Sequence, residues 1–231
     1  MRNIIVTFCS ILTLLILLSC SSEGSKEQLQ SNQQLNEIKT KPLAQDTNAK
    51  QIDSIKQIEQ AQKSIERPQY MISVSQAGKK LGDIIIELFP DIAPKHCKNF
   101  DSLVAIKFYD GTAFHRVIPG FMIQGGDPNS KNKPEAMWGM GDNSQKKIPA
   151  EFSKLKHERG TISAARSQDV NSATSQFFIC VAPAPHLDGQ YSIFGKVLSG
   201  MDVADKVVNT PRDKSDKPLK KVEMKIRKIK K

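Results

Sequence analysis

Cysteine and histidine are scarce in this sequence, and their spacing is not typical of a metal centre. The 231 residues contain four of each, with no CxxC pair. No P-loop lysine follows Gly125 and Gly126, and the serine and histidine residues are scattered rather than grouped as a nucleophile with its base. We therefore expect no metal and no cofactor.

The four cysteines divide by position along the chain. Cys9 lies within an apolar leader, Cys20 ends that leader, and Cys97 and Cys180 belong to the globular part. Cys97 and Cys180 could form a disulfide in an oxidising compartment, or remain buried free thiols. Their apolar neighbours favour the free thiols.

The chain has a positive balance, with a formal net charge of +10. Ten of its 34 lysine and arginine residues lie in 212–231, so the surplus is partly a property of the tail. It does not predict a groove for nucleic acid, and we expect no nucleic-acid partner. Attraction of this basic surface to an anionic membrane stays open.

The first residues are typical of an export signal. Arg2 precedes an apolar run at 4–18 that is too short for a comfortable membrane span. The run ends in Leu17-Leu18-Ser19-Cys20, which resembles the lipobox of bacterial lipoproteins. We predict a signal peptide at 1–19 and acylation of Cys20, which anchors the protein to a bacterial membrane in the cell envelope. The alternative is an uncleaved transmembrane anchor, and either interpretation places the rest outside the cytoplasm.

Residues 20–66 are predicted to form a polar stalk. Serine, glutamine, asparagine, lysine and glutamate dominate 21–47, which cannot bury enough apolar surface to fold. Isoleucines recur at intervals typical of a short amphipathic helix over 52–65. That segment is either a docking or self-associating helix, or a frayed helix in a flexible linker.

Residues 67–231 have the pattern of one mainly β domain. Glycine and proline separate short alternating or apolar runs typical of strands. The predicted strands are 70–74, 82–88, 112–118, 121–124, 161–165, 176–181, 192–197 and 222–229. Helices are predicted at 91–104, with Pro94 in the first turn, and at 201–209. This order fits a closed eight-stranded antiparallel barrel capped by two helices.

Five blocks in this region resemble the cyclophilin family. The run at 114–127, FHRVIPGFMIQGGD, closely resembles the central motif of that family. The other blocks follow in the family's order at 147–152, 160–166, 171–179 and 186–195. The resemblance covers the whole globular part, and it implies a cyclophilin-like barrel with peptidyl-prolyl cis/trans isomerase activity.

Isomerisation of a proline peptide bond requires no covalent step. The barrier of about 18–20 kcal/mol comes from delocalisation of the nitrogen lone pair into the carbonyl. A catalyst must hold the ring and stabilise the twisted state. The resemblance implies that Arg116 is the catalytic donor, through a guanidinium that can address both the imide nitrogen and a carbonyl. His115 would support the site without transferring a proton.

The same resemblance implies the residues that bind substrate. Considered alone, most of them are ordinary core or surface residues. The predicted substrate-binding residues are Phe121, Met122, Gln124, Ala165, Arg166, Gln176, Phe178, His186, Leu187 and Tyr191. Apolar members would surround the proline ring, the two glutamines would offer amides to the peptide backbone, and Ala165 and Arg166 would form the groove edge.

Several positions depart from the family's pattern. His186 stands where many members have tryptophan, Tyr191 where a histidine is common, and Arg166 where many have asparagine. Without the indole we expect weak cyclosporin binding. The loop at 128–146 departs further, and Trp138 within it is either an exposed contact for unfolded chains or a residue that packs the loop down.

These patterns predict an isomerase for proteins that fold in the cell envelope. Its partners would be proline-containing polypeptides and, through Cys20, a membrane, and we expect a monomer. One alternative is a chaperone module that grips proline segments with little turnover. Another is a surface adhesin or scaffold that uses the basic tail or the segment 52–65.

Overall fold

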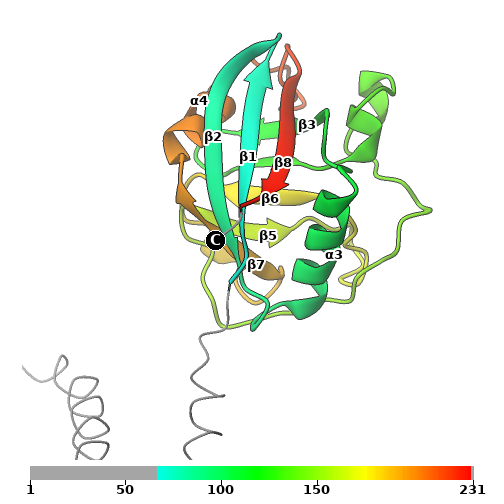
Figure 1. The fold of residues 1–231 in the computed structure, drawn as a ribbon, viewed down its shortest axis with the longest axis vertical. Coiled ribbons are helices and arrows are strands. Elements are labelled where there is room, and N and C mark those ends of the chain that lie inside the picture. The colour runs from blue at the N-terminus through cyan, green and yellow to red at the C-terminus, as the bar shows by residue number, and fades with distance from the viewer. Residues whose placement is uncertain (1–66, 230–231) are drawn as a thin grey trace, which may run out of the picture. The chain divides into compact units, whose positions relative to one another are not determined.

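The computed structural model describes residues 67–229. The predicted signal peptide at 1–19, the stalk at 20–66 and the isoleucine segment at 52–65 lie outside these residues. The described part folds around a single strongly curved sheet that closes on itself, with two α-helices packed against it (Figure 1).

Eight antiparallel strands form the barrel. In chain order they are β1 Gln69–Gln76, β2 Lys79–Leu88, β3 Thr112–Ile118, β4 Met122–Gly125, β5 Thr161–Ala164, β6 Phe177–Cys180, β7 Ile193–Ser199 and β8 Val222–Lys228. Around the barrel they follow the order β1, β2, β7, β5, β6, β4, β3 and β8, which pairs with β1 again. The fold class predicted from the sequence is confirmed.

The strands alternate buried and more exposed side chains, as a barrel with a filled interior requires. In β1, Tyr70, Ile72 and Val74 point inward and are fully buried. In β2, Ile84 and Ile86 occupy the matching inward positions, and the register pairs Ile72 with Ile84. The interior between these strands is therefore a packed apolar core.

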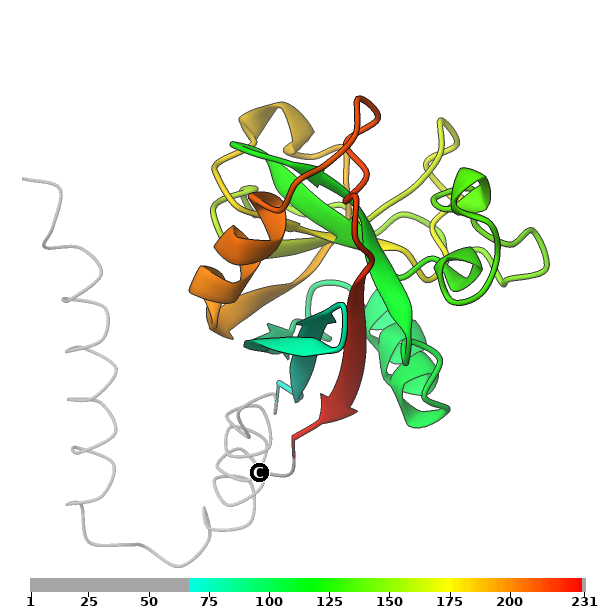
Figure 2. The same cartoon turned by 90° about the horizontal axis from the view of Figure 1, so that it is seen from above.

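Two helices lie on opposite sides of the barrel (Figures 1 and 2). Helix α3 spans Pro94–Ala105, with Pro94 in the first turn as predicted. The Glu151 carboxylate accepts the backbone N–H groups of Lys95 and His96 at 3.0 Å each, so a distant loop caps the helix start. Helix α4 spans Met201–Val208 and buries Val203 against the barrel.

The structure extends some elements beyond their predicted bounds. The predicted strands at 70–74 and 82–88 are the inner parts of a longer hairpin, whose ends carry polar residues that hid its continuation. Ala77 and Gly78 connect β1 to β2 with φ angles of +50° and +78°, as a tight hairpin turn requires. Three short 3₁₀ helices were not predicted: η1 Pro128–Ser130, η2 Glu135–Met137 and η3 Pro185–Leu187.

Within residues 67–229, Cys97 and Cys180 are both buried free thiols, so the structure has the second of the two predicted alternatives. Burial raises the pKa of each thiol to about 12, which keeps both protonated at neutral pH. In the same residues no helix is both long and apolar enough to span a membrane.

Candidate active site

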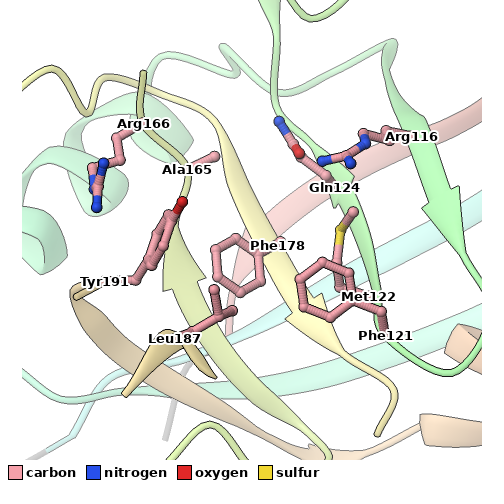
Figure 3. A pocket seen from close by; sticks show the side chains of 9 residues that line it. All are labelled: Arg116, Phe121, Met122, Gln124, Ala165, Arg166, Phe178, Leu187 and Tyr191. Atoms are coloured by element: carbon pink, nitrogen blue, oxygen red, sulfur yellow. The ribbon is translucent and has the colours of Figure 1, made fainter. Parts of the chain in front are cut away.

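A small pocket of about 140 Å³ opens on the barrel wall at β4 and β6 (Figure 3). Its size suits one small ring, because pockets that bind drug-sized ligands have volumes of at least about 300 Å³. Nine of the predicted site residues line it: Arg116, Phe121, Met122, Gln124, Ala165, Arg166, Phe178, Leu187 and Tyr191. Three predicted residues, His115, Gln176 and His186, lie beside the pocket rather than in its lining.

Three adjacent strands build one side of the pocket, which we call the barrel side: Arg116 on β3, Phe121, Met122 and Gln124 at β4, and Phe178 on β6. The sheet register pairs Arg116 with Gln124 and Gln124 with Phe178. These three side chains therefore lie in a row across neighbouring strands. The backbone ladder alone sets their spacing.

Loops build the opposite side, which we call the loop side: Ala165, Arg166, Leu187 and Tyr191. Ala165 and Arg166 directly follow β5, Leu187 ends η3, and Tyr191 precedes β7. The backbone N–H of Ala165 donates to the Gln176 carbonyl at 3.0 Å, which fixes the start of this loop against β6.

Arg116 extends from β3 to the rim of the pocket and is exposed. Among the described residues, its side chain has no hydrogen bond and no ion pair. The guanidinium therefore keeps its donors free for a molecule in the pocket. Its neighbours Gln124 and Met122 present an amide and an apolar surface beside it (Figure 3).

Apolar side chains form the floor and walls. Met122, Phe178 and Leu187 are 2%, 5% and 8% exposed, and Phe121 is half-buried beside them. The Tyr191 ring packs edge-on to Phe178 with 5.8 Å between centroids. Such a lining attracts an uncharged ring and offers it no competing polar partner.

The two glutamines form a chain of amides that leads away from Arg116. Gln124 Nε2 donates to Gln176 Oε1 at 3.1 Å, and Gln176 Nε2 donates to the Gly139 carbonyl at 3.2 Å. Gln176 therefore stands behind Gln124 and orients its amide, which leaves the Gln124 carbonyl oxygen facing the pocket side.

His115 directly precedes Arg116 on β3 and is 5% exposed. Neither ring nitrogen has a hydrogen-bond partner among residues 67–229. Burial lowers the pKa of His115, and the nearby Asp127 carboxylate opposes that shift only in part. The imidazole is therefore neutral at pH 7.

His186 and Trp138 differ in how they relate to the pocket. His186 is exposed and packs on the outer face of Phe121 with 5.3 Å between ring centroids. Trp138 is half-buried, donates its indole N–H to the Lys133 carbonyl at 3.0 Å and lies 5.9 Å from the Lys221 ammonium. This favours the alternative in which Trp138 packs its loop down. Weak cyclosporin binding stays a prediction.

One pair near the site was missed in the sequence. The Asp188 carboxylate accepts the backbone N–H of His157 at 2.8 Å and lies 3.1 Å from its Nδ1. The His157 ring is stacked behind Phe178, with 6.1 Å between centroids and 17° between planes. The pair is 31 residues apart in sequence and no local pattern joins it, although Asp188 directly follows the predicted Leu187.

Among the described residues, no group of three or more histidine, cysteine, aspartate or glutamate side chains could hold a metal ion. The pocket offers a bound molecule its shape, an apolar floor, the donors of Arg116 and the carbonyl oxygen of Gln124. A ring bound in the pocket would lie next to the positive charge of Arg116 at the pocket rim.

Comparison with known proteins adds the family. The sequence model of the family described as cyclophilin type peptidyl-prolyl cis-trans isomerase matches residues 71–231. A probable peptidyl-prolyl cis-trans isomerase of Brucella suis biovar 1 is 51% identical over 132 residues, 55% of this chain and 67% of the relative. Peptidyl-prolyl cis-trans isomerase CYP18-1 of Arabidopsis thaliana is 45% identical over 146 residues, 62% of this chain and 88% of the relative.

Solved structures agree with this match. A cyclophilin type peptidyl-prolyl cis-trans isomerase of Cryptosporidium parvum is 34% identical, with a TM-score of 0.63 over 71% of this chain and 99% of that one. A second structure of that protein, determined in the presence of the dipeptide Ala-Pro, has a TM-score of 0.62 and 36% identity over the same shares. The chain belongs to the cyclophilin-type peptidyl-prolyl cis-trans isomerase family and has its isomerase activity.

Proposed function

We propose that this isomerase acts on proline-containing segments of proteins that fold in a bacterial cell envelope, with Arg116 as its catalytic residue. The observation that carries the proposal is the Arg116 guanidinium, which has no ion-pair partner among residues 67–229 and lies at the rim of a pocket of proline-ring size with an apolar floor. A structural relative crystallised in the presence of the dipeptide Ala-Pro supports a ligand of this kind.

The proposed mechanism follows from the pocket lining. Phe121, Met122, Phe178 and Leu187 hold the proline ring still while the preceding carbonyl rotates. Arg116 donates toward the imide nitrogen, which favours the lone pair staying on nitrogen and thereby weakens the partial double bond. Because this interaction strengthens as the bond twists, it stabilises the transition state more than either isomer.

Gln124 would bind the peptide backbone next to the proline. Its amide is held by Gln176, which is itself held by the Gly139 carbonyl. Such preorganisation lowers the entropy that binding must remove. Ala165 and Arg166 lie at the other edge of the pocket, where the backbone of an extended peptide can pass.

The isomerisation rate of a short proline peptide tests these roles. We expect the full chain to accelerate it and Arg116→Ala to lose most of that acceleration while keeping the native melting curve. A variant that still accelerates the reaction fully would refute the catalytic role of Arg116. If Arg116→Ala instead lost turnover but still protected unfolded clients from aggregation, proline-segment binding would be the main activity, as the alternative function predicts.

The envelope location rests on the sequence, because the lipobox-like residues lie outside the described part of the chain. Acylation of Cys20 would hold the domain at a bilayer through a stalk at 20–66, near newly exported chains whose proline bonds isomerise in tens of seconds without help. Closure of the barrel leaves no open strand edge among residues 67–229, which supports a monomer.

Metabolic labelling with a fatty acid tests the anchor. Cys20→Ala should lose both the label and the cleavage of the leader. Cys9→Ala is the matched control, since it removes a cysteine from the same leader and should change neither. Retained label in Cys20→Ala would refute the lipoprotein proposal.

A further inference from the structure

The arginines of the described residues divide into two groups. Residues 67–229 contain six arginines, and four of them form an ion pair with a carboxylate. These pairs are Arg67 with Asp91, Arg159 with Asp205, Arg212 with Asp216 and Arg227 with Asp110. Arg116 and Arg166 remain without a carboxylate partner in this part of the chain, and both line the pocket.

Arg166 is held in a fixed position by neutral groups alone. Its Nη2 and Nε donate to the Gln190 carbonyl at 3.0 and 3.4 Å, and Nη1 donates to the carbonyls of Ser167 and Gln168 at 2.9 and 3.4 Å. The guanidinium carbon also lies 4.4 Å from the centre of the Tyr191 ring. These contacts fix the orientation of the guanidinium but leave its charge uncompensated.

Asp169, three residues beyond Arg166, and Asp188, two residues before Gln190, are occupied elsewhere. Asp169 accepts the backbone N–H of Asn171 at 2.9 Å, and Asp188 is held by His157 and Lys156. Figure 3 shows Arg166 and Arg116 at opposite ends of the pocket, with the Tyr191 ring between the Arg166 guanidinium and Phe178. A peptide that leaves the pocket across Tyr191 therefore approaches a preoriented cation that has no carboxylate partner in the described part of the chain.

We propose that Arg166 forms a carboxylate-binding subsite, which makes this isomerase prefer prolines that have an aspartate or glutamate within two residues. The proposal rests on the proposed function in one respect, because it needs the peptide to bind in this pocket. Arg116 must stay unpaired to reach the imide, whereas no step at the imide requires a second cation across Tyr191. The charge of Arg166 is thus available for the side chain of the client.

The expected effect is moderate because the subsite is partly open to solvent. Two charges at about 4 Å interact weakly in water and several-fold more strongly at a protein surface, and exposed pairs keep only part of that energy. We expect a proline peptide with a neighbouring glutamate to have a kcat/KM about 3- to 10-fold above that of its glutamine counterpart, and a lysine peptide to fall below both.

The test measures kcat/KM of the full chain for glutamate, glutamine and lysine peptides, with the varied residue placed one or two residues before or after the proline. A glutamate preference at any of the four positions supports the subsite, and it should shrink as ionic strength rises from about 0.01 M to about 1 M. Equal values for all three peptides at all four positions would overturn it. Acceleration of the glutamine peptide tests the proposed function separately, because that peptide carries no charge for Arg166 to bind.

Three variants assign the preference to Arg166. Arg166→Gln should bring the glutamate-to-glutamine ratio close to one, and Arg166→Lys should retain part of it, because lysine keeps the charge but lacks the planar fork. Lys225→Gln removes the same net charge from the exposed face of β8 and should leave the ratio unchanged. A preference that persists in Arg166→Gln would overturn the assignment and point to Arg116 as its source.

Discussion

The barrel side and the loop side of the pocket are built in different ways. On the barrel side, hydrogen-bonded strands β3, β4 and β6 fix Arg116, Gln124 and Phe178 relative to one another. On the loop side, Leu187, Tyr191 and Arg166 depend on side-chain bonds between loops. All three noted departures from the family's residues, at 166, 186 and 191, lie on the loop side or beside it. The strands thus hold the barrel-side residues through backbone pairing, whereas the loop-side residues depend on side-chain contacts.

His157 is the centre of the loop-side bonds. Its carbonyl accepts the backbone N–H of Ala184 at 2.7 Å, and its backbone N–H and ring bind Asp188, on the two flanks of η3. Its Nε2 lies 3.2 Å from the Ser163 hydroxyl on β5. One buried side chain therefore joins the loop that carries Leu187 to the barrel.

The largest effect should come from the barrel side. Arg116→Lys keeps the positive charge but replaces a planar fork of donors with a point charge. We expect kcat/KM for a proline peptide to fall about 100-fold, as for loss of one preorganised transition-state donor. Arg159→Lys, at a surface ion pair with Asp205, is the matched control and should keep the wild-type value. Near-normal activity of Arg116→Lys would show that charge alone suffices and that strand-fixed geometry matters less than we argue.

A loop-side change should alter binding more than chemistry. His157→Phe keeps a ring behind Phe178 but removes the bonds of the imidazole to Asp188 and Ser163. We expect the free energy of unfolding to drop by about 1–3 kcal/mol. KM should rise while kcat changes less, because Leu187 loses its fixed position and Arg116 does not. Urea unfolding and steady-state kinetics measure the two quantities.

Asp188→Asn should also raise KM, because it weakens the same contact between His157 and Asp188 from the side of the carboxylate. Asp205→Asn is its control, because it breaks a surface ion pair away from the pocket. If His157→Phe instead lowered kcat and left KM constant, the loop side would act on the chemical step, contrary to the proposal that it acts mainly on binding.

A substitution away from both sides should affect stability alone. Glu151→Gln weakens the cap of α3 and the bond of 2.6 Å between Glu151 and His96 Nδ1. We expect a loss of about 1–2 kcal/mol in the free energy of unfolding, as for removal of a helix cap, with kcat/KM unchanged. Glu158→Gln, at an exposed position, should change neither. A change in kcat/KM for Glu151→Gln would show that the pocket depends on the helix as well.

The sequence predicted the barrel side better than the loop side for a physical reason. Strand β3 has its predicted bounds of 112–118, and β4 differs from its predicted bounds by one residue at each end, because alternation along a strand determines which side chains share a face. Once β3 and β4 pair, the positions of Arg116 and Gln124 follow. The local pattern and the family motif were therefore enough to predict which residues surround Arg116 and Gln124.

The loop side depends on contacts between distant segments that no local pattern encodes. The contact of Arg166 with Tyr191 joins two loops, and the contact of Asp188 with His157 joins a third loop to the one that carries Tyr191. Gln176 stays a predicted substrate-binding residue, and the structure places it behind Gln124 and outside the lining. These differences arise because loop conformation is set by tertiary hydrogen bonds rather than by the periodicity of the chain.

The smallest effect concerns pH. Burial lowers the pKa of His96, His115 and His157 in the folded protein, so the unfolded chain, with histidine pKa near 6.5, takes up protons that the folded chain refuses. Well above pH 6.5 these histidines are neutral in both the folded and the unfolded protein, so burying them costs nothing through proton binding. As pH drops from about 7.5 toward 5 the unfolded chain binds more protons, and the free energy of unfolding should therefore fall. Urea unfolding at several pH values measures the slope. His157→Phe should flatten it by removing one of three contributions, whereas an unchanged slope would mean that the loop-side histidine accepts a proton in place and that Asp188 holds the loop through an ion pair.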